Sequence, residues 1–358
     1  MNRHAELART LLDPIGDAAF FAERWCQKPA YCRGTPDRFA ALFGLADLPG
    51  ALLGDMGPRA ASPRGGPATR QELLQTGARR PPIALKAYYN TASGRGSEIL
   101  DVPLNQAMAL YDAGLTLCVS GLERNSESLA AFVAAVRERM RFSGNVLVNA
   151  YYSPDGQGFN WHYDSQHVFI LQIEGEKRWQ FSDQVALGDP PFNLPLEVMQ
   201  QPGAAEALAQ LGLRLKLPSE IPGEIPGEIS TLEEVLAPGD VLYLPPGTWH
   251  RAFARGRSFA LSLTLVPLSF SDVLRTVLAF IGLQRDRWRK ELNQGVPLGA
   301  GGPPEQVPEQ IQELLRECLA DAQDAIGRLS PEELLATWAQ IRQTPMVALA
   351  LKEITSRG

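Results

Sequence analysis

The chain has 358 residues, 45% of them hydrophobic, which is enough for two or three domains with a substantial core. Its formal net charge of −6 argues against non-specific nucleic-acid binding, which needs a basic face. An acidic chain suits a basic protein or peptide partner, although a mildly acidic charge is also ordinary for cytoplasmic proteins.

The cysteines and the apolar segments favour a cytoplasmic protein. Cys26, Cys32, Cys118 and Cys318 are scattered without a C-x-x-C pair, so we expect neither disulfides nor a structural zinc site. The first residues lack the hydrophobic core of a secretion signal. The longest apolar run near the C-terminal third is short and contains Arg275, so no membrane-spanning segment is expected.

Residues 1–83 are predicted to form a helical lead-in followed by a loop. Positions 6–53 have the pattern of helices with short connectors, whereas 56–82 are rich in Pro, Gly and Arg, which favours an exposed loop. The arginines of this loop face either solvent or an acidic partner: Arg59, Arg64, Arg70, Arg79 and Arg80.

Residues 84–267 are predicted to form a β-rich domain. Within this range, a helix over 129–140 leads into the main run of strands. The helix has one apolar face, made of Leu129, Phe132, Val133, Val136 and Met140.

The segment Asn160-Trp-His-Tyr-Asp164 is the first half of a candidate metal site. Strand alternation places His162 and Asp164 on one face and Tyr163 on the other. The second half is the segment 238–250, in which a turn, a short apolar strand and a Pro-Pro-Gly turn end on His250. Two imidazoles and one carboxylate at facial positions are typical of non-haem Fe(II) oxygenases. The alternative is a strand histidine hydrogen-bonded to Asp164.

A candidate cation follows the first half of this motif. The residues Ile173-Glu174-Gly175-Glu176 predict a hairpin turn between two apolar strands. Lys177 then shares a face with Trp179 and Phe181, and a buried lysine on that face needs an anionic partner. The alternative register places Arg178 inward instead.

A long insertion, roughly 185–235, separates the two halves of the metal motif. It contains an Ile-Pro-Gly-Glu repeat within 219–230, where the density of Pro and Gly excludes a long helix or a central strand. We expect a surface excursion near the mouth of the barrel, either a substrate lid or a simple loop expansion.

Residues 268–358 are predicted to be helical. Ser271 and Asp272 can cap a first helix, a Gly/Pro linker covers 295–304, a second helix spans the apolar positions from Ile311 to Ile326, and Ser330 with Glu333 forms a capping box for a third. Their apolar residues exceed the needs of one stripe, which predicts a homodimer through these helices.

These features together resemble the JmjC branch of the cupin superfamily. The resemblance rests on His162-x-Asp164, His250, the strands from Asn149-Ala-Tyr-Tyr152 to Trp179, and the lead-in motif Trp25-x-x-Lys28-Pro29. Within that branch it is similar to ribosomal oxygenases and to the asparaginyl hydroxylase of hypoxia signalling. It implies an α+β protein with a double-stranded β-helix (jelly-roll, cupin) core over 84–267, a helical lead-in before it and a helical region after it.

The resemblance also implies a cofactor set and residue roles. Fe(II) would be held by His162, Asp164 and His250, with 2-oxoglutarate and O2 as co-substrates. Lys177, thirteen positions after Asp164, would hold the distal carboxylate of 2-oxoglutarate. Four further polar residues match positions that line the co-substrate pocket or lie near it, or are core polar residues satisfied by the backbone: Asn149, Tyr151, Ser262 and Thr264.

Three functions compete at this stage. The resemblance favours hydroxylation of a side chain in a protein or peptide. The same chemistry could act on a free amino acid or small metabolite, or demethylate an N-methyl-lysine. A non-catalytic cupin-like binding protein belongs to a different class, and the intact set of three metal ligands argues against it.

Overall fold

The computed structural model describes residues 3–54, 84–90, 97–218, 229–289 and 309–344. The chain divides into two compact units, Met1–Pro267 and Leu268–Gly358. The expected arginine-rich loop, nearly all of the Ile-Pro-Gly-Glu repeat and the 295–304 linker lie outside the described residues. Within the described ranges, no helix is long and apolar enough to cross a membrane.

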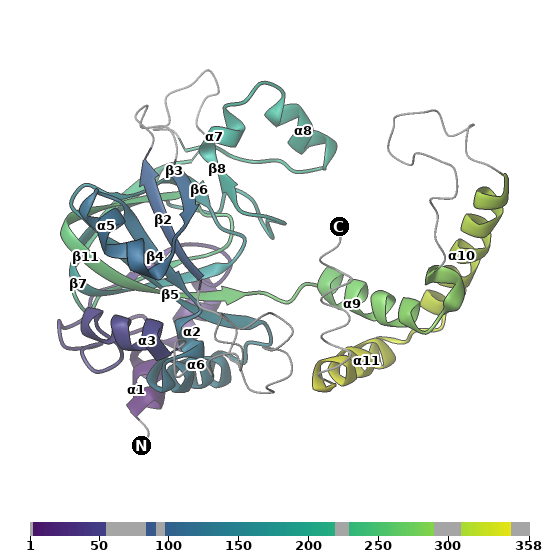
Figure 1. Ribbon diagram of the computed structural model, residues 1–358, viewed down its shortest axis with the longest axis horizontal. Helices are drawn as coiled ribbons and strands as arrows, with labels where there is room; N and C mark the ends of the chain where they lie inside the picture. Colours follow the sequence, from purple (N-terminus) through teal and green to yellow (C-terminus); the bar gives the residue numbers. More distant parts are fainter. Residues whose placement is uncertain (1–2, 55–83, 91–96, 219–228, 290–308, 345–358) are drawn as a thin grey trace, which may run out of the picture. The chain divides into compact units, whose positions relative to one another are not determined.

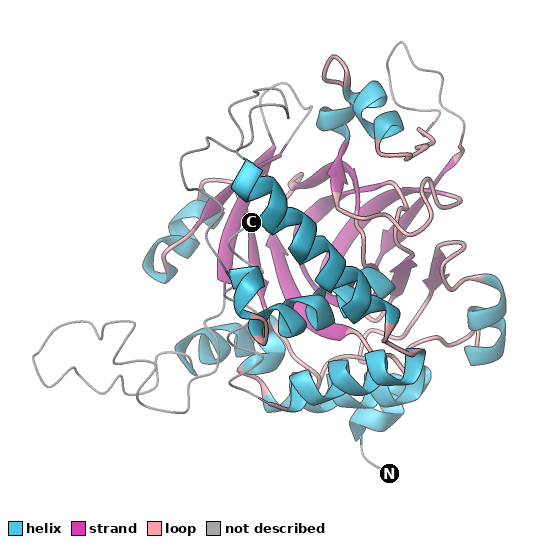
Figure 2. Ribbon diagram, turned by 90° about the vertical axis from the view of Figure 1, so that its right-hand side faces the viewer, coloured by secondary structure: helices cyan, strands magenta, loops and turns pink. Residues whose placement is uncertain are grey.

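Two long strands, β7 (His167–Ser182) and β11 (His250–Val266), organise the first unit. They pair antiparallel along almost their whole length. The C-terminal half of β11 and the N-terminal half of β7 form the centre of one sheet, in the order β3-β2-β4-β5-β11-β7-β10-β1. Their other halves form the centre of a second sheet, in the order β8-β6-β11-β7-β9. The expected double-stranded β-helix is confirmed (Figures 1 and 2).

The other strands are short. Their bounds are Ala30–Cys32 for β1, Ala84–Asn90 for β2, Ser97–Asp101 for β3, Thr116–Ser120 for β4, Asn145–Ser153 for β5, Gly158–Tyr163 for β6, Leu194–Pro195 for β8, Thr231–Leu236 for β9 and Val241–Leu244 for β10. Short 3-10 turns lie at Leu45–Asp47, Leu104–Gln106, Leu122–Arg124 and Asp286–Arg289.

The predicted hairpin at 173–176 is wrong, because β7 runs through it without a turn. Gly175 adopts φ +65° and the pairing with β11 shifts register between Arg255 and Ala260. A glycine with positive φ therefore bends the strand here so that it passes from one sheet to the other. The predicted alternation survives the bend, since Lys177, Trp179 and Phe181 are buried while Arg178 is exposed.

The N-terminal helices cover the larger sheet. The helices α1 (Arg3–Thr10), α2 (Asp17–Glu23), α3 (Leu48–Gly54), α5 (Ala107–Asp112) and α6 (Glu127–Met140) belong to this unit. Phe20 on α2 packs 4.8 Å from the ring of Tyr243 on β10. The predicted face of α6 is buried except for Met140, which is half-buried. Figure 1 draws α1, α2, α3 and α6 at one end of the strands.

The lead-in also supplies a strand that the sequence did not predict. Residues Ala30–Cys32 pair with β10 and extend the larger sheet. Three residues between a proline and polar neighbours are too few to show a period-2 pattern.

The insertion after β7 is ordered over its described residues. It forms β8, α7 (Leu196–Met199), α8 (Ala204–Gln210) and, at its end, β9. Leu194, Leu196, Met199 and Leu208 pack in one apolar cluster with Tyr163 and other residues of β6. The excursion is thus anchored on the smaller sheet.

The second unit contains α9 (Phe270–Leu283), α10 (Glu309–Gly327) and α11 (Pro331–Gln343). The cap predicted at Ser271 is wrong, because Ser269 caps α9 and forms a capping box with Asp272. The predicted box of Ser330 and Glu333 is present. Val277 and Ile341 form the buried centre between α9 and α11, whereas Leu315, Leu319, Ile326 and Leu335 are exposed.

The bend at Gly175 generates a stability prediction. A Cβ at Gly175 would overlap the carbonyl oxygen of Arg257, whereas Gly256 has a similar φ of +70° and open space around it. We expect Gly256→Ala to cost about 1 kcal/mol of unfolding free energy for the left-handed backbone. Gly175→Ala should cost about 3 kcal/mol or more, because a packed strand must also move. Urea unfolding of both variants measures this difference, and equal losses would contradict the role of the bend.

Candidate metal centre

Two buried aromatic residues orient the histidines. Tyr163 follows His162 on β6, and Trp249 precedes His250 at the start of β11. Both aromatic side chains are fully buried, with ring centroids 5.1 Å apart in an edge-to-face arrangement. Because neighbouring side chains of a strand point to opposite faces, this contact turns both histidines to the other face.

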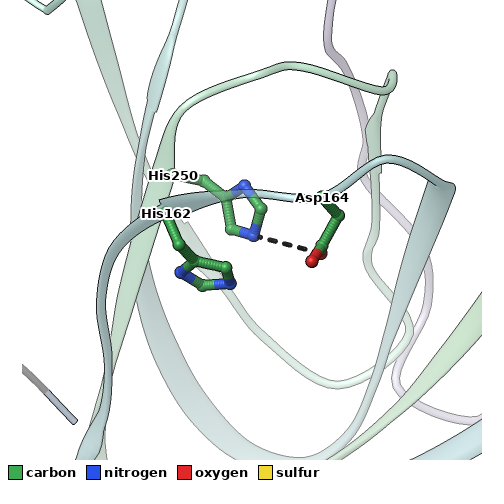
Figure 3. A group of neighbouring side chains, drawn as sticks. All are labelled: His162, Asp164 and His250. Atoms are coloured by element: carbon green, nitrogen blue, oxygen red, sulfur yellow. Dashed lines mark ion pairs between the residues drawn. The ribbon is translucent and has the colours of Figure 1, made fainter. Parts of the chain in front are cut away.

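His162 and His250 are direct partners in the β6–β11 ladder. Their ring centroids lie 4.2 Å apart. Asp164 comes just after β6, where its backbone carbonyl accepts a hydrogen bond of 2.8 Å from the N–H of Gly247. Gly247 has φ +74° in the Pro-Pro-Gly turn, so this turn holds the carboxylate and His250 together. Figure 3 shows the three side chains converging.

The donor atoms of these three side chains lie within 4.8 Å of one another. The Nε2 atom of His250 is 3.7 Å from Oδ2 of Asp164, the pair drawn with a dashed line in Figure 3. The Nδ1 atoms of His162 and His250 lie 2.7 Å from the carbonyl of Asn160 and 2.9 Å from that of Thr248. A carbonyl only accepts, so each Nδ1 carries a proton and Nε2 is the nitrogen that remains to face a metal ion.

The electrostatics of the three residues fit a cation. Burial lowers the pKa of His250 well below its usual range, and His162 adds to this, so the imidazole is neutral and able to bind a metal. Burial raises the pKa of Asp164, with His162 opposing the shift. A half-buried carboxylate beside the neutral imidazole of His250 lacks a counter-charge that a divalent ion would supply.

The three residues open into a cavity of about 340 Å³ between the two sheets. Small side chains on β11, Ala252 and Ala260, leave room beside the larger Trp179. The cavity contains all of the residues that the sequence analysis selected: Asn149, Tyr151, His162, Asp164, Lys177, His250, Ser262 and Thr264.

Lys177 is the buried cation of the cavity. It is 2% exposed, and its Nζ donates a 3.1 Å hydrogen bond to Oγ of Ser153, which also accepts one from Thr116. The rings of Tyr151 and Phe159 lie 5.9 and 5.5 Å from Nζ. No carboxylate in the described part of the chain pairs with Lys177, and burial lowers its pKa to about 8. An anion entering the cavity would find this ammonium available.

The four weaker candidates line the cavity in different ways. Asn149 accepts a 3.3 Å hydrogen bond from the N–H of Gly121. The hydroxyls of Ser262 and Thr264 lie 3.1 Å from each other. Burial raises the pKa of Tyr151 well above its usual range, so it is a neutral phenol. Asn149 thus has a backbone partner, whereas the hydroxyls of Ser262 and Thr264 contact each other.

Sequence reasoning missed several lining residues. Tyr88 comes from β2, Ser153 supports Lys177 from the end of β5, and Asn193 and Glu197 come from the excursion. Ser153 shows the only local signal, since it shares a face of β5 with the candidates Asn149 and Tyr151. The others lie far from the motif in sequence, and only the fold brings them to it.

The fold and this site define a double-stranded β-helix domain with two histidines and one carboxylate that could hold a metal ion. Residues 128–273 match the family model of the JmjC domain, a range that includes all three ligands and Lys177. This segment of the chain is therefore similar to JmjC domains.

Curated relatives are similar over part of their length. Ribosomal oxygenase 1 of Gallus gallus is 27% identical over 313 residues, which are 84% of this chain and 43% of the relative. The bifunctional lysine-specific demethylase and histidyl-hydroxylase NO66 of Drosophila sechellia is 26% identical over 229 residues, 60% of this chain and 31% of the relative. The chain therefore spans less than half the length of either relative.

Solved structures are similar in outline. The structure of Escherichia coli ycfD has a TM-score of 0.49 at 17% identity, and the match covers 88% of this chain and 68% of that one. The structure of YcfD, a ribosomal oxygenase, in complex with cobalt and 2-oxoglutarate has a TM-score of 0.48 at the same identity.

The burial of Lys177 generates a prediction on stability and pH. The folded-state pKa is lowered from 10.5 to about 8, so folding without a ligand is penalised by about 3 kcal/mol below pH 8, and the penalty disappears as pH rises to about 10.5. Lys177→Met should therefore stabilise the ligand-free protein at pH 7, with a gain that shrinks at alkaline pH.

The exposed neighbour provides the control. Arg178→Met should give a small difference from the parent that does not change between pH 7 and 10.5, because an exposed arginine stays charged throughout. Unfolding free energies from denaturant titrations at several pH values test this. If Arg178→Met raised the unfolding free energy in a pH-dependent way and Lys177→Met did not, Arg178 rather than Lys177 would be the buried cation.

Proposed function

We propose that this protein is an Fe(II)- and 2-oxoglutarate-dependent oxygenase that hydroxylates a side chain of a protein or peptide. The observation that carries the proposal is the combination, in one cavity, of three candidate metal ligands and a buried ammonium on Lys177 that has no carboxylate partner among the described residues. A buried lysine needs an anionic partner, and a dicarboxylate that reaches the metal would supply one. The JmjC match and the names of the relatives support the same class.

Each residue has a defined task in this proposal. His162, Asp164 and His250 hold Fe(II), which with bound 2-oxoglutarate and O2 supplies the oxidising chemistry. Lys177 binds the distal carboxylate of 2-oxoglutarate, and Ser153 holds its Nζ in place. Asn149, Tyr151, Ser262 and Thr264 line the co-substrate part of the cavity. The protein positions the target C–H bond near the metal and keeps water away, and no side chain needs to act as an acid or base.

A polypeptide substrate is favoured over a free metabolite. The cavity is bordered by the ordered excursion rather than sealed, and the relatives are described as ribosomal oxygenases and as a histidyl-hydroxylase with demethylase activity. Ribosomal proteins, which are basic, are therefore the first substrates to test, in a cytoplasmic setting. An N-methyl-lysine demethylase would use the same site and differs in its product, which loses a methylene group instead of gaining one oxygen atom.

The metal ligands generate the first test. We expect Fe(II)-dependent conversion of 2-oxoglutarate to succinate to fall by at least about a hundredfold in each of His162→Ala, Asp164→Ala and His250→Ala. Replacing even a residue that only hydrogen-bonds to a metal ligand typically lowers metal affinity or activity about tenfold to a hundredfold. His4→Ala, which removes a histidine on α1, is the matched control and should keep the parent rate. Succinate release measured by NMR decides the matter, and parent-like turnover in the three ligand variants would refute the iron assignment.

The exposed leucines of the second unit generate another test. We propose that the protein is a homodimer through its C-terminal helices, because Leu315 and Leu319 lie one turn apart on α10 and both are exposed. Light scattering should give twice the chain mass for the full-length protein at micromolar concentration. Leu315→Asp with Leu319→Asp should give monomers, and Glu317→Ala serves as the control on the same helix. A monomeric parent protein would exclude the dimer.

A further inference from the structure

The excursion places one carboxylate at the edge of the metal cavity. Strand β8 pairs with β6 so that Pro195 lies opposite His162, and Glu197 follows two residues later in the first turn of α7. Glu197 lines the same cavity as the metal ligands and is half-buried, so its carboxylate lies between the cavity and solvent.

The position of Glu197 is fixed from both sides. Leu196 and Met199 are buried in the apolar cluster of the excursion. On the other side, Oδ1 of Asn193 accepts hydrogen bonds from the backbone N–H and the hydroxyl of Ser165, at 2.8 and 2.9 Å, next to the ligand Asp164. A carboxylate on a segment anchored in this way is preorganised relative to the metal centre.

The charges of the cavity leave Glu197 without a counter-ion. Among the described lining residues, the acidic and basic side chains other than histidine are Asp164, Lys177 and Glu197. The charges of Fe(II), Asp164, the two carboxylates of 2-oxoglutarate and Lys177 cancel. Glu197 therefore remains as one negative charge, and no lysine or arginine of the described ranges forms an ion pair with it. Burial raises its pKa, which shows that the carboxylate is partly desolvated.

We propose that Glu197 is a specificity-determining residue that binds a cationic side chain of the polypeptide substrate, the guanidinium of an arginine or the ammonium of a lysine, and directs it toward the metal. The inference rests on the proposed oxygenase function and names the substrate class of that site. A partly desolvated, preorganised carboxylate discriminates by charge. A neutral side chain would displace water from the carboxylate without replacing the interactions that the water made, whereas a cationic side chain would replace them.

Peptide binding tests the proposal without relying on turnover. Labelled peptides with identical flanks and a central Arg, Lys, norleucine or Glu are titrated by fluorescence anisotropy against the anaerobic protein loaded with Fe(II) and 2-oxoglutarate. The parent protein should bind the Arg or Lys peptide about tenfold more tightly than the norleucine peptide. Glu197→Gln should remove this difference and Glu197→Asp should retain part of it. Glu206→Gln, an exposed position on α8 with the same change of charge, should behave as the parent.

Charge reversal guards against a merely damaged site. Glu197→Lys should bind the peptide with a central Glu more tightly than the parent does, a gain that misfolding cannot produce. Equal affinity of the parent for all peptides, or an unchanged preference in Glu197→Gln, overturns the proposal. Succinate release by the parent protein separates the two levels: without it the oxygenase function fails, whereas normal release with no charge preference refutes only the role of Glu197.

Discussion

The contact between Tyr163 and Trp249 is the interaction on which the metal centre depends. Each ring is adjacent in sequence to a metal-ligand candidate, and together the rings fill the space behind β6 and the start of β11. The strand geometry then leaves one direction for the two imidazoles, and the backbone carbonyls of Asn160 and Thr248 set their tautomers. Orientation of the ligands is thus a product of packing on the opposite face, not of contacts among the ligands themselves.

The two long strands also contribute to the cavity. Strands β7 and β11 belong to both sheets, so residues separated by the bend face one common space. Lys177 lies opposite Ala254 on β11, and His250 lies opposite Phe181 on β7. These pairings place Lys177 and His250 on neighbouring strands of the same ladder. The two strands therefore place Lys177 and His250 at the cavity, whereas His162 and Asp164 come from β6 and the loop after it.

Local alternation explains what the sequence predicted and what it did not. The two histidines, Asp164 and Lys177 follow period-2 patterns within single strands, and the apolar face of α6 follows a helical period, so these positions were accessible without a fold. Gly175 was misread because a glycine between acidic residues is equally compatible with a turn and with a bend in a continuous strand. Ser153, Tyr88 and Glu197 reach the cavity only through pairings of strands distant in sequence, which no local pattern encodes.

The amide of Asn193 links two segments that are 28 residues apart in the chain. Its oxygen accepts hydrogen bonds from Ser165 and from Gln166. The side chain of Asn193 thus joins the excursion to the loop after Asp164. A displacement of Asn193 would therefore act directly on Ser165, the residue that follows Asp164. A substitution at Asn193 would therefore change the surroundings of Asp164 without contacting that carboxylate.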